Sequence, residues 1–86
     1  MNPAAIPDRP TAAQLREAAT YLHGGRKHGA LIRLAELTGT PVQSLRIYAS
    51  GGRPVPRWLA ASLRNLITLR LVAEATAERQ AKKESA

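Results

Sequence analysis

Four side chains between positions 42 and 47 have the chemistry that proteins use to recognise the edges of bases. Gln43 can pair bidentately with adenine, and Arg46 can pair in the same way with guanine. Val42 and Ile47 are apolar, and such side chains pack against thymine methyl groups. For these two residues the alternative is packing in a core or an interface. The chemistry of this stretch is therefore that of recognition.

The positive charge of the chain is concentrated around the same stretch. The formal net charge is +7, and residues 26–70 hold eight basic residues against one acidic residue, Glu36. Such a field suits a polyanion, with DNA as the first expectation and an anionic membrane surface as the weaker one. The polar residues that we expect to contact phosphate are Arg26, Lys27, Arg33, Ser44, Arg53 and Arg57.

The composition argues against catalysis and against a metal centre. There is no cysteine, there are only two histidines, and the six carboxylates are too sparse for acid–base chemistry. Serine, histidine and aspartate show no nucleophilic arrangement, so we expect no enzyme activity, no cofactor and no metal. No apolar run reaches transmembrane length and the N-terminus lacks a signal pattern, which favours a cytoplasmic protein.

Two short helices joined by a tight turn are expected to position the recognition side chains. The apolar residues of the first helix recur at helical spacing until Gly39, where a sharp turn needs a positive φ or a close backbone approach. Thr40 is expected to cap the second helix, over about residues 41–50, and Pro41 to begin it. The residues expected to face inward are Leu31, Leu34, Ala35 and Leu37 on the first helix, and Leu45 and Tyr48 on the second.

This pattern resembles the helix-turn-helix regulators of the lambda-repressor (Cro and C1) type, especially the short phage- and plasmid-borne ones. The resemblance covers roughly residues 11–70. It depends on the small residue Ala35, on Gly39 at the turn, and on the apolar residues Leu45 and Tyr48. All four occur where the family has residues of the same type.

The resemblance implies sequence-specific binding of double-stranded DNA and a role in transcription regulation, most simply repression. It also implies dimers on palindromic operators. Thr38 and Thr40 depart from the family pattern, because they stand where the family usually has apolar residues. The positions from which the family reads bases in the major groove correspond to Val42, Gln43, Arg46 and Ile47.

The rest of the chain is expected to complete an all-α fold of four helices. Thr11 and Gln14 form a capping box, which predicts a first helix over residues 12–23. A last helix is expected from about residue 57 to 79, with Val55 filling the core just before it. The expected boundaries are 1–10 for a flexible arm, 11–79 for the helix-turn-helix domain with its C-terminal helix, and 80–86 for a frayed tail.

The last helix is apolar over most of its circumference, so we expect it to be buried on more than one side. One face closes the domain, and the second contains Trp58, Leu69, Val72 and Ala73, although Trp58, at the start of the helix, is expected to anchor the core. A chain this short supplies no partner for the second face, which favours a homodimer. The residues expected at this interface are Leu69, Leu71, Val72 and Ala73.

The residues leave three alternatives open. One is an antitoxin-type regulator whose C-terminal segment binds a protein. The second is a MerR-like or excisionase-like module, suggested by residues 45–48, although residues 53–56 followed by an apolar helix argue against the β-hairpin wing that it needs. The third is an interaction or inhibitor protein whose basic face binds an acidic protein or RNA.

Overall fold

The computed structural model describes residues 1–84, and every regular element in that range is helical. The expected all-α fold of four α-helices is confirmed, and no strand occurs among the described residues. One short 3-10 helix, η1, precedes the α-helices. The elements are η1 (Pro3–Ala5), α1 (Ala12–Leu22), α2 (Ala30–Thr38), α3 (Val42–Ala49) and α4 (Arg57–Glu84).

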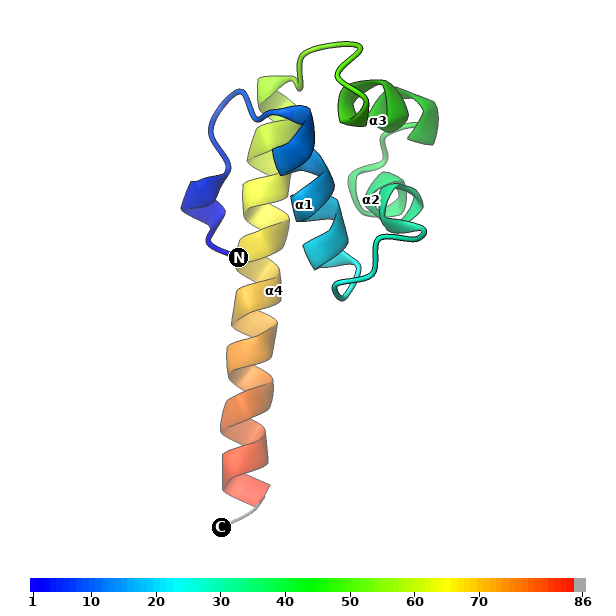
Figure 1. Ribbon diagram of the computed structural model, residues 1–86. Helices are drawn as coiled ribbons and strands as arrows, with labels where there is room; N and C mark the ends of the chain where they lie inside the picture. Colours follow the sequence, from blue (N-terminus) through cyan, green and yellow to red (C-terminus); the bar gives the residue numbers. More distant parts are fainter. Residues whose placement is uncertain (85–86) are drawn as a thin grey trace.

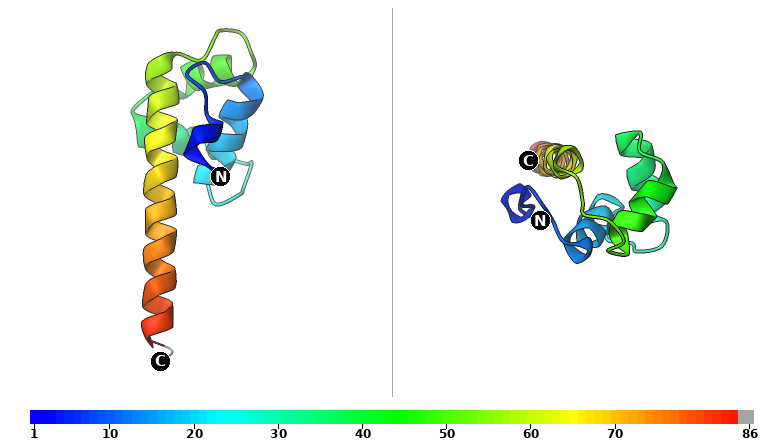
Figure 2. Two further views of the ribbon diagram at one scale, coloured as in Figure 1. Left: turned by 90° about the vertical axis from the view of Figure 1, so that its left-hand side faces the viewer. Right: turned by 90° about the horizontal axis from the view of Figure 1, so that it is seen from above.

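The helices α1, α2 and α3 form a compact group beside the first half of α4, and the rest of α4 projects beyond them (Figures 1 and 2). Apolar side chains from all four helices meet inside this group, and Val55 is buried there as expected. Buried residues on α4 recur every four positions and so share one side of the helix. The largest fully buried side chains are Leu15, Leu34, Leu45, Leu59, Leu63 and Ile67.

The predicted capping box begins α1. The backbone N–H of Thr11 donates to Oε1 of Gln14 at 2.8 Å, and the N–H of Gln14 donates to Oγ1 of Thr11 at 3.1 Å. Two N–H groups that would otherwise lack helical partners are thereby satisfied. The helix ends one residue earlier than expected, with His23 as its C-cap.

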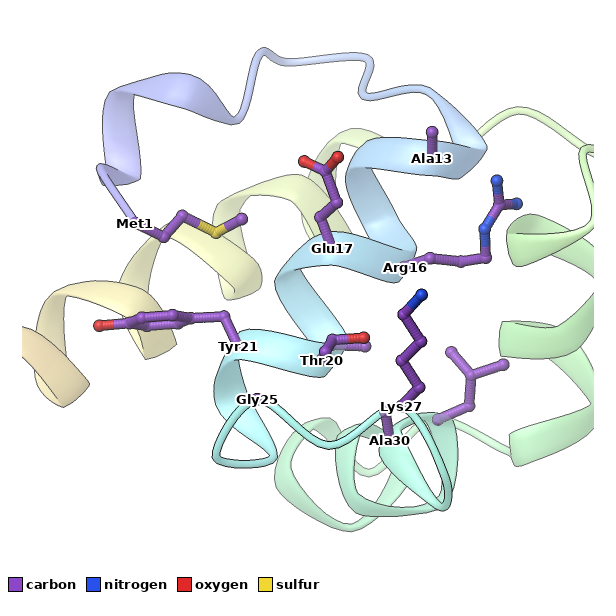
Figure 3. A pocket seen from close by; sticks show the side chains of 11 residues that line it. Met1, Ala13, Arg16, Glu17, Thr20, Tyr21, Gly25, Lys27 and Ala30 are labelled. Carbon is purple, nitrogen blue, oxygen red and sulfur yellow. The ribbon is translucent and has the colours of Figure 1, made fainter.

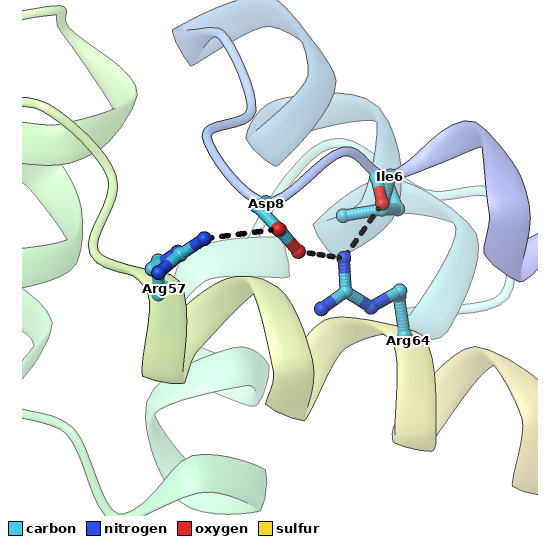
Figure 4. Close-up of polar contacts among 4 residues, drawn as sticks. All are labelled: Ile6, Asp8, Arg57 and Arg64. Atoms are coloured by element: carbon cyan, nitrogen blue, oxygen red, sulfur yellow. Dashed lines mark hydrogen bonds and ion pairs between the residues drawn. The ribbon is translucent and has the colours of Figure 1, made fainter.

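The N-terminal segment is not the flexible arm expected from its prolines. Ile6 is only 2% exposed and belongs to the hydrophobic core. Asp8 forms ion pairs with Arg57 at 3.3 Å and with Arg64 at 3.2 Å (Figure 4). Arg64 also donates to the carbonyl oxygen of Ile6 at 3.0 Å. An apolar plug and a charged cluster therefore fix this segment against α4.

A polar cluster ties the middle of α4 to α1. The hydroxyl of Tyr21 donates to the Glu74 carboxylate at 3.4 Å, and Nε of Arg70 bonds the same carboxylate at 3.0 Å. Arg70 also lies over the Tyr21 ring, 6.0 Å from its centroid. Desolvation, together with the nearby Glu74 carboxylate, raises the pKa of Tyr21, so its hydroxyl remains a donor at neutral pH. The cluster therefore fixes the direction in which α4 leaves the domain.

α4 continues past the end that the sequence suggested. We expected it to stop near residue 79, but it extends to Glu84, and residues 85 and 86 of the expected tail lie outside the described part. No glycine or proline interrupts the chain after Arg57, and alanine, the strongest helix former, recurs through the second half. Polar composition alone therefore gave the wrong helix end.

Some apolar side chains lie elsewhere than the pattern indicated. Trp58, expected to anchor the core, is 54% exposed, because the adjacent Leu59 takes the inward position and successive helical residues differ by about 100°. Leu37, expected to face inward, is also exposed. Leu71, expected at a dimer interface, is half-buried against the core because it follows Ile67 by one helical turn.

Candidate nucleic-acid interface

Gly39 makes the turn between α2 and α3. It adopts a left-handed conformation with φ 70°, and its N–H donates to the carbonyl of Ala35 at 2.9 Å. The predicted positive φ is thus confirmed, and a residue with a Cβ would be strained here. The chain changes direction sharply at this point. In Figure 1, α2 is seen almost along its axis, whereas α3 lies across the view.

Two threonines beside the glycine form a hydrogen-bonded pair that supports the turn. Their hydroxyl oxygens lie 2.9 Å apart, and the backbone N–H of Thr40 donates to the Thr38 hydroxyl at 3.3 Å. Thr38 also bonds the carbonyl oxygen of Leu34 at 2.9 Å. The expected capping role of Thr40 is wrong: its buried hydroxyl pairs with Thr38, and Pro41 occupies the N-cap position. The two threonines therefore satisfy each other's polar groups beside the turn.

α3 presents one face to the core and the other to solvent. Leu45 is fully buried and Ala49 is buried four residues later, while Tyr48 is half-buried as the second expected inward residue. Because inward residues three or four apart share one side of a helix, the intervening residues face outward. Among the expected base-reading residues, Gln43, Arg46 and Ile47 are exposed and Val42 is half-buried.

Arg16 holds the C-terminal end of α3, a role that the sequence pattern did not reveal. It extends from α1, and its Nη1 donates to the carbonyl oxygen of Ala49, the last residue of α3. The final carbonyls of a helix lack intrahelical partners and carry partial negative charge, so a guanidinium there is favourable. Figure 3 shows Arg16 leaving α1 in the direction of α3. The orientation of α3 is therefore fixed at both ends.

Exposed cations lie in the loop before α2 and in the loop after α3. Arg26 and Lys27 belong to the loop that precedes α2, whose N-cap, Gly29, provides no side-chain bond to the first N–H groups of that helix. Arg53 is exposed in the loop after α3. A helix N-terminus with cationic neighbours is a favourable place for a phosphate. These residues have the exposure that phosphate contacts require.

Three of the expected phosphate residues have other surroundings. Arg33 forms an exposed ion pair with Glu36 at 3.0 Å, and such surface pairs are weak enough for a phosphate to replace the carboxylate. Ser44 is half-buried on α3. Arg57 pairs with Asp8, which also pairs with Arg64, and this network fixes the N-terminal segment against α4, so we leave Arg57 out of the candidate site.

A hollow of about 700 Å³ lies on the outer side of α1 (Figure 3). Its walls come from the first residue of the chain, from α1, and from the loop and first turn of α2. Arg16 and Lys27 line it on the side nearer α3, and no residue of α3 contributes to it. This hollow is therefore separate from the outward face of α3.

Within residues 1–84, no helix combines the length and apolarity that a membrane span requires. The same residues contain no group of three or more histidine, cysteine, aspartate or glutamate side chains able to hold a metal ion. Comparisons with protein-family models, with curated proteins and with solved structures find no match to this chain. The residues and their geometry are therefore the basis for assigning a function.

Proposed function

We propose that this protein binds double-stranded DNA sequence-specifically with α3 in the major groove, and that it regulates transcription as a repressor. The observation that carries the proposal is the outward face of α3, where Gln43, Arg46 and Ile47 are exposed. Amide and guanidinium groups pair with adenine and guanine edges, and an apolar side chain packs on a thymine methyl. An α-helix fits the width of the major groove of B-DNA.

Reading of base edges also needs a helix in a fixed orientation. Leu45 secures α3 to the core, the Gly39 turn defines where it begins, and Arg16 holds its last carbonyl group. Little backbone freedom is then lost on binding, which favours affinity. The resemblance of residues 11–70 to lambda-repressor-like regulators supports the same function.

The surrounding charge supports binding to the DNA backbone. Between residues 26 and 53 there are five basic residues and a single carboxylate, that of Glu36. Contacts from such cations to phosphates fix the register of a protein on a duplex without specifying the sequence. The residues proposed for these contacts are Arg26, Lys27, Arg33 and Arg53.

The partner that we propose is a palindromic operator bound by a homodimer in the cytoplasm. One helix of this length reads only a few base pairs, whereas two copies read two half-sites about 34–36 Å apart. A protein bound across a promoter in this way excludes other DNA-binding proteins from it. Repression is therefore the simplest regulatory outcome.

Salt dependence tests the proposal most directly. Duplexes selected from a random pool would be titrated with the protein at several salt concentrations. Each phosphate contact adds about 0.9 to the magnitude of the log–log slope, so four contacts predict about 3.6 per bound monomer. Arg53→Ala should reduce that magnitude by about 0.9, and the matched variant Arg9→Ala, which removes an exposed arginine from the N-terminal segment, should leave it unchanged. A nearly flat response of the wild type would overturn DNA binding.

Competition with RNA tests the alternative in which the basic surface binds a ligand other than double-stranded DNA. If the basic surface binds RNA or an acidic protein, then unlabelled RNA should displace the selected duplex at equal concentration. For a major-groove reader it should not, because the major groove of an A-form RNA helix is too narrow for side chains to enter. Displacement by RNA at equimolar concentration would therefore exclude the proposed mode of binding.

A further inference from the structure

An exposed apolar stripe lies along α4, opposite the side that faces the core. Relative to Trp58, with about 100° per residue, Leu69 lies at about +20° and Val72 at about −40°. The buried residues Leu63 and Ile67 lie at about 140° and 180°. The three stripe residues are 54%, 65% and 58% exposed in chain order. α4 is therefore buried on one side and unpartnered on the other.

The second half of α4 lies apart from the other helices. After the cluster at Glu74, the helix projects away from α1, α2 and α3 (Figures 1 and 2). Residues 75–83 are all exposed, whereas most helical stability in proteins comes from tertiary packing. A partner along the stripe would supply that packing.

We infer that a second copy of this chain packs along the stripe, with the two α4 helices antiparallel and Leu69 of each copy against Val72 of the other. This inference specifies the homodimer within the proposed function, and its main evidence comes from α4. It differs from the interface expected from the sequence in three respects: Trp58 belongs to it, Leu71, which packs inward, does not, and Ala73 is not among its facing residues.

The spacing of the outward residues supports this register. Trp58, Leu69 and Val72 occupy positions of a series with alternating steps of four and three residues, the spacing by which one helix packs along another, and the other positions of the series are polar. In an antiparallel pair, residues whose numbers add to 141 then lie opposite each other. The resulting layers are Leu69 with the partner's Val72, Asn65 with the partner's Thr76, Ser62 with the partner's Arg79, and Trp58 with the partner's Lys83.

The charges decide between the two possible directions. A parallel pair would place Arg79 against the partner's Arg79 and Lys83 against the partner's Lys83, in addition to bringing two basic domains together. The antiparallel pair removes both repulsions, because Arg79 then meets the hydroxyl of the partner's Ser62. Lys83 meets the ring of the partner's Trp58, a favourable cation–π arrangement. The stripe is therefore self-complementary in only one direction.

Along the α4 axis, the antiparallel arrangement also separates the two copies by about the spacing of successive major grooves. α3 lies level with the first turns of α4 along that axis and is displaced to one side of them (Figures 1 and 2). The centre of the pairing falls between Arg70 and Leu71, about twelve residues further along. At 1.5 Å per residue, the first turns of the two α4 helices lie about 36 Å apart along the helix axis. Half-sites one DNA turn apart are separated by about 34–36 Å.

Disulfide formation between introduced cysteines tests the register, because the chain has no cysteine of its own. Asn65 and Thr76 are both exposed, so neither Asn65→Cys nor Thr76→Cys should disturb folding. The two variants would be mixed in equal amounts without DNA, oxidised, and analysed by mass spectrometry of the linked peptides. We expect the 65–76 product to exceed the 65–65 and 76–76 products at least tenfold. In the matched control, Glu78→Cys, on the opposite side of α4, replaces Thr76→Cys and should give less than a tenth of that product.

Dominant 65–65 and 76–76 products would show a parallel pair and overturn the inference, as would equal amounts of all three. Sedimentation provides the second measurement: wild type should be dimeric at tens of micromolar, and the Leu69→Glu/Val72→Glu variant should be monomeric with unchanged helical circular dichroism. A wild type that sediments as a monomer would also overturn the inference. The dimer and the DNA-binding proposal can fail separately, because a 65–76 product together with a flat salt response would retain the dimer and exclude the operator.

Discussion

Arg16 on α1 donates a hydrogen bond to the carbonyl oxygen of Ala49, thirty-three residues later in the chain, where α3 ends. This bond connects the first helix of the domain to the far end of the helix that carries Gln43 and Arg46. A charged donor at a helix C-terminus is stronger than a neutral one, because it also interacts with the helix dipole. The relationship makes Arg16 a positioning residue for the proposed reading of DNA.

Arg16→Ala should therefore weaken DNA binding without removing a phosphate contact. Because the group is partly exposed, we expect a loss of about 1 kcal/mol in both the free energy of unfolding and the binding of cognate DNA. The salt slope of binding should stay within error of the wild-type slope. Arg9→Ala, which removes an exposed arginine from the N-terminal segment, is the matched control and should change neither quantity. A slope that falls by about 0.9 would instead identify Arg16 as a phosphate contact.

The role of Arg16 illustrates what the sequence did not reveal. Local features, such as the capping box at Thr11 and the turn at Gly39, are encoded within a few residues and were predicted correctly. The Arg16 bond joins a side chain to a backbone carbonyl distant in sequence, and a carbonyl has no residue type to signal it. No periodicity distinguishes this arginine from a solvated one.

The N-terminal segment was wrongly predicted for a related reason. Its three prolines indicate a chain that cannot continue a helix, and we interpreted that as flexibility. Proline also lowers the conformational freedom of the unfolded chain, so a segment that finds a docking surface loses less entropy on folding. Here that surface is α4, through Ile6 and Asp8. A lone isoleucine and a lone aspartate carry no pattern from which such docking could be recognised.

Ile6→Ala tests whether this segment contributes to the stability of the domain. Removal of a buried isoleucine side chain typically costs about 2–5 kcal/mol, and we expect a value near the lower end because a terminal segment can partly relax. At about 4–8 °C per kcal/mol for a domain of this size, Tm should fall by about 10 °C.

Ile32→Ala is the matched control for Ile6→Ala, because Ile32 on α2 is about half exposed. It should lower Tm much less, since little apolar surface is removed from a buried site. Thermal unfolding followed by circular dichroism measures both variants. Equal and small shifts would mean that residues 1–10 do not contribute to the core in solution.

The sequence predicted the outward face of α3 more completely than any other part of the candidate site. Leu45 and Tyr48 were expected to face the core, and that expectation alone placed Gln43, Arg46 and Ile47 outside. Val42, the first residue of α3, is half-buried. The residues that contact phosphate were harder to predict from the sequence, since an arginine such as Arg57 pairs with whichever carboxylate the fold brings near it.

The separation of base-reading from phosphate-binding residues gives the sharpest prediction for this face. Gln43→Ala and Arg46→Ala should each cost about 1–3 kcal/mol on the cognate duplex and relax the preference at one base position, because each removes a bidentate pair. Arg53→Ala is the matched comparison: it removes a backbone contact and should weaken cognate and random duplexes equally. Binding to the cognate site, to its single-base variants and to random DNA, all at one salt concentration, measures both effects. If Gln43→Ala weakened cognate and random DNA to the same extent, α3 would have to contact DNA through a different face.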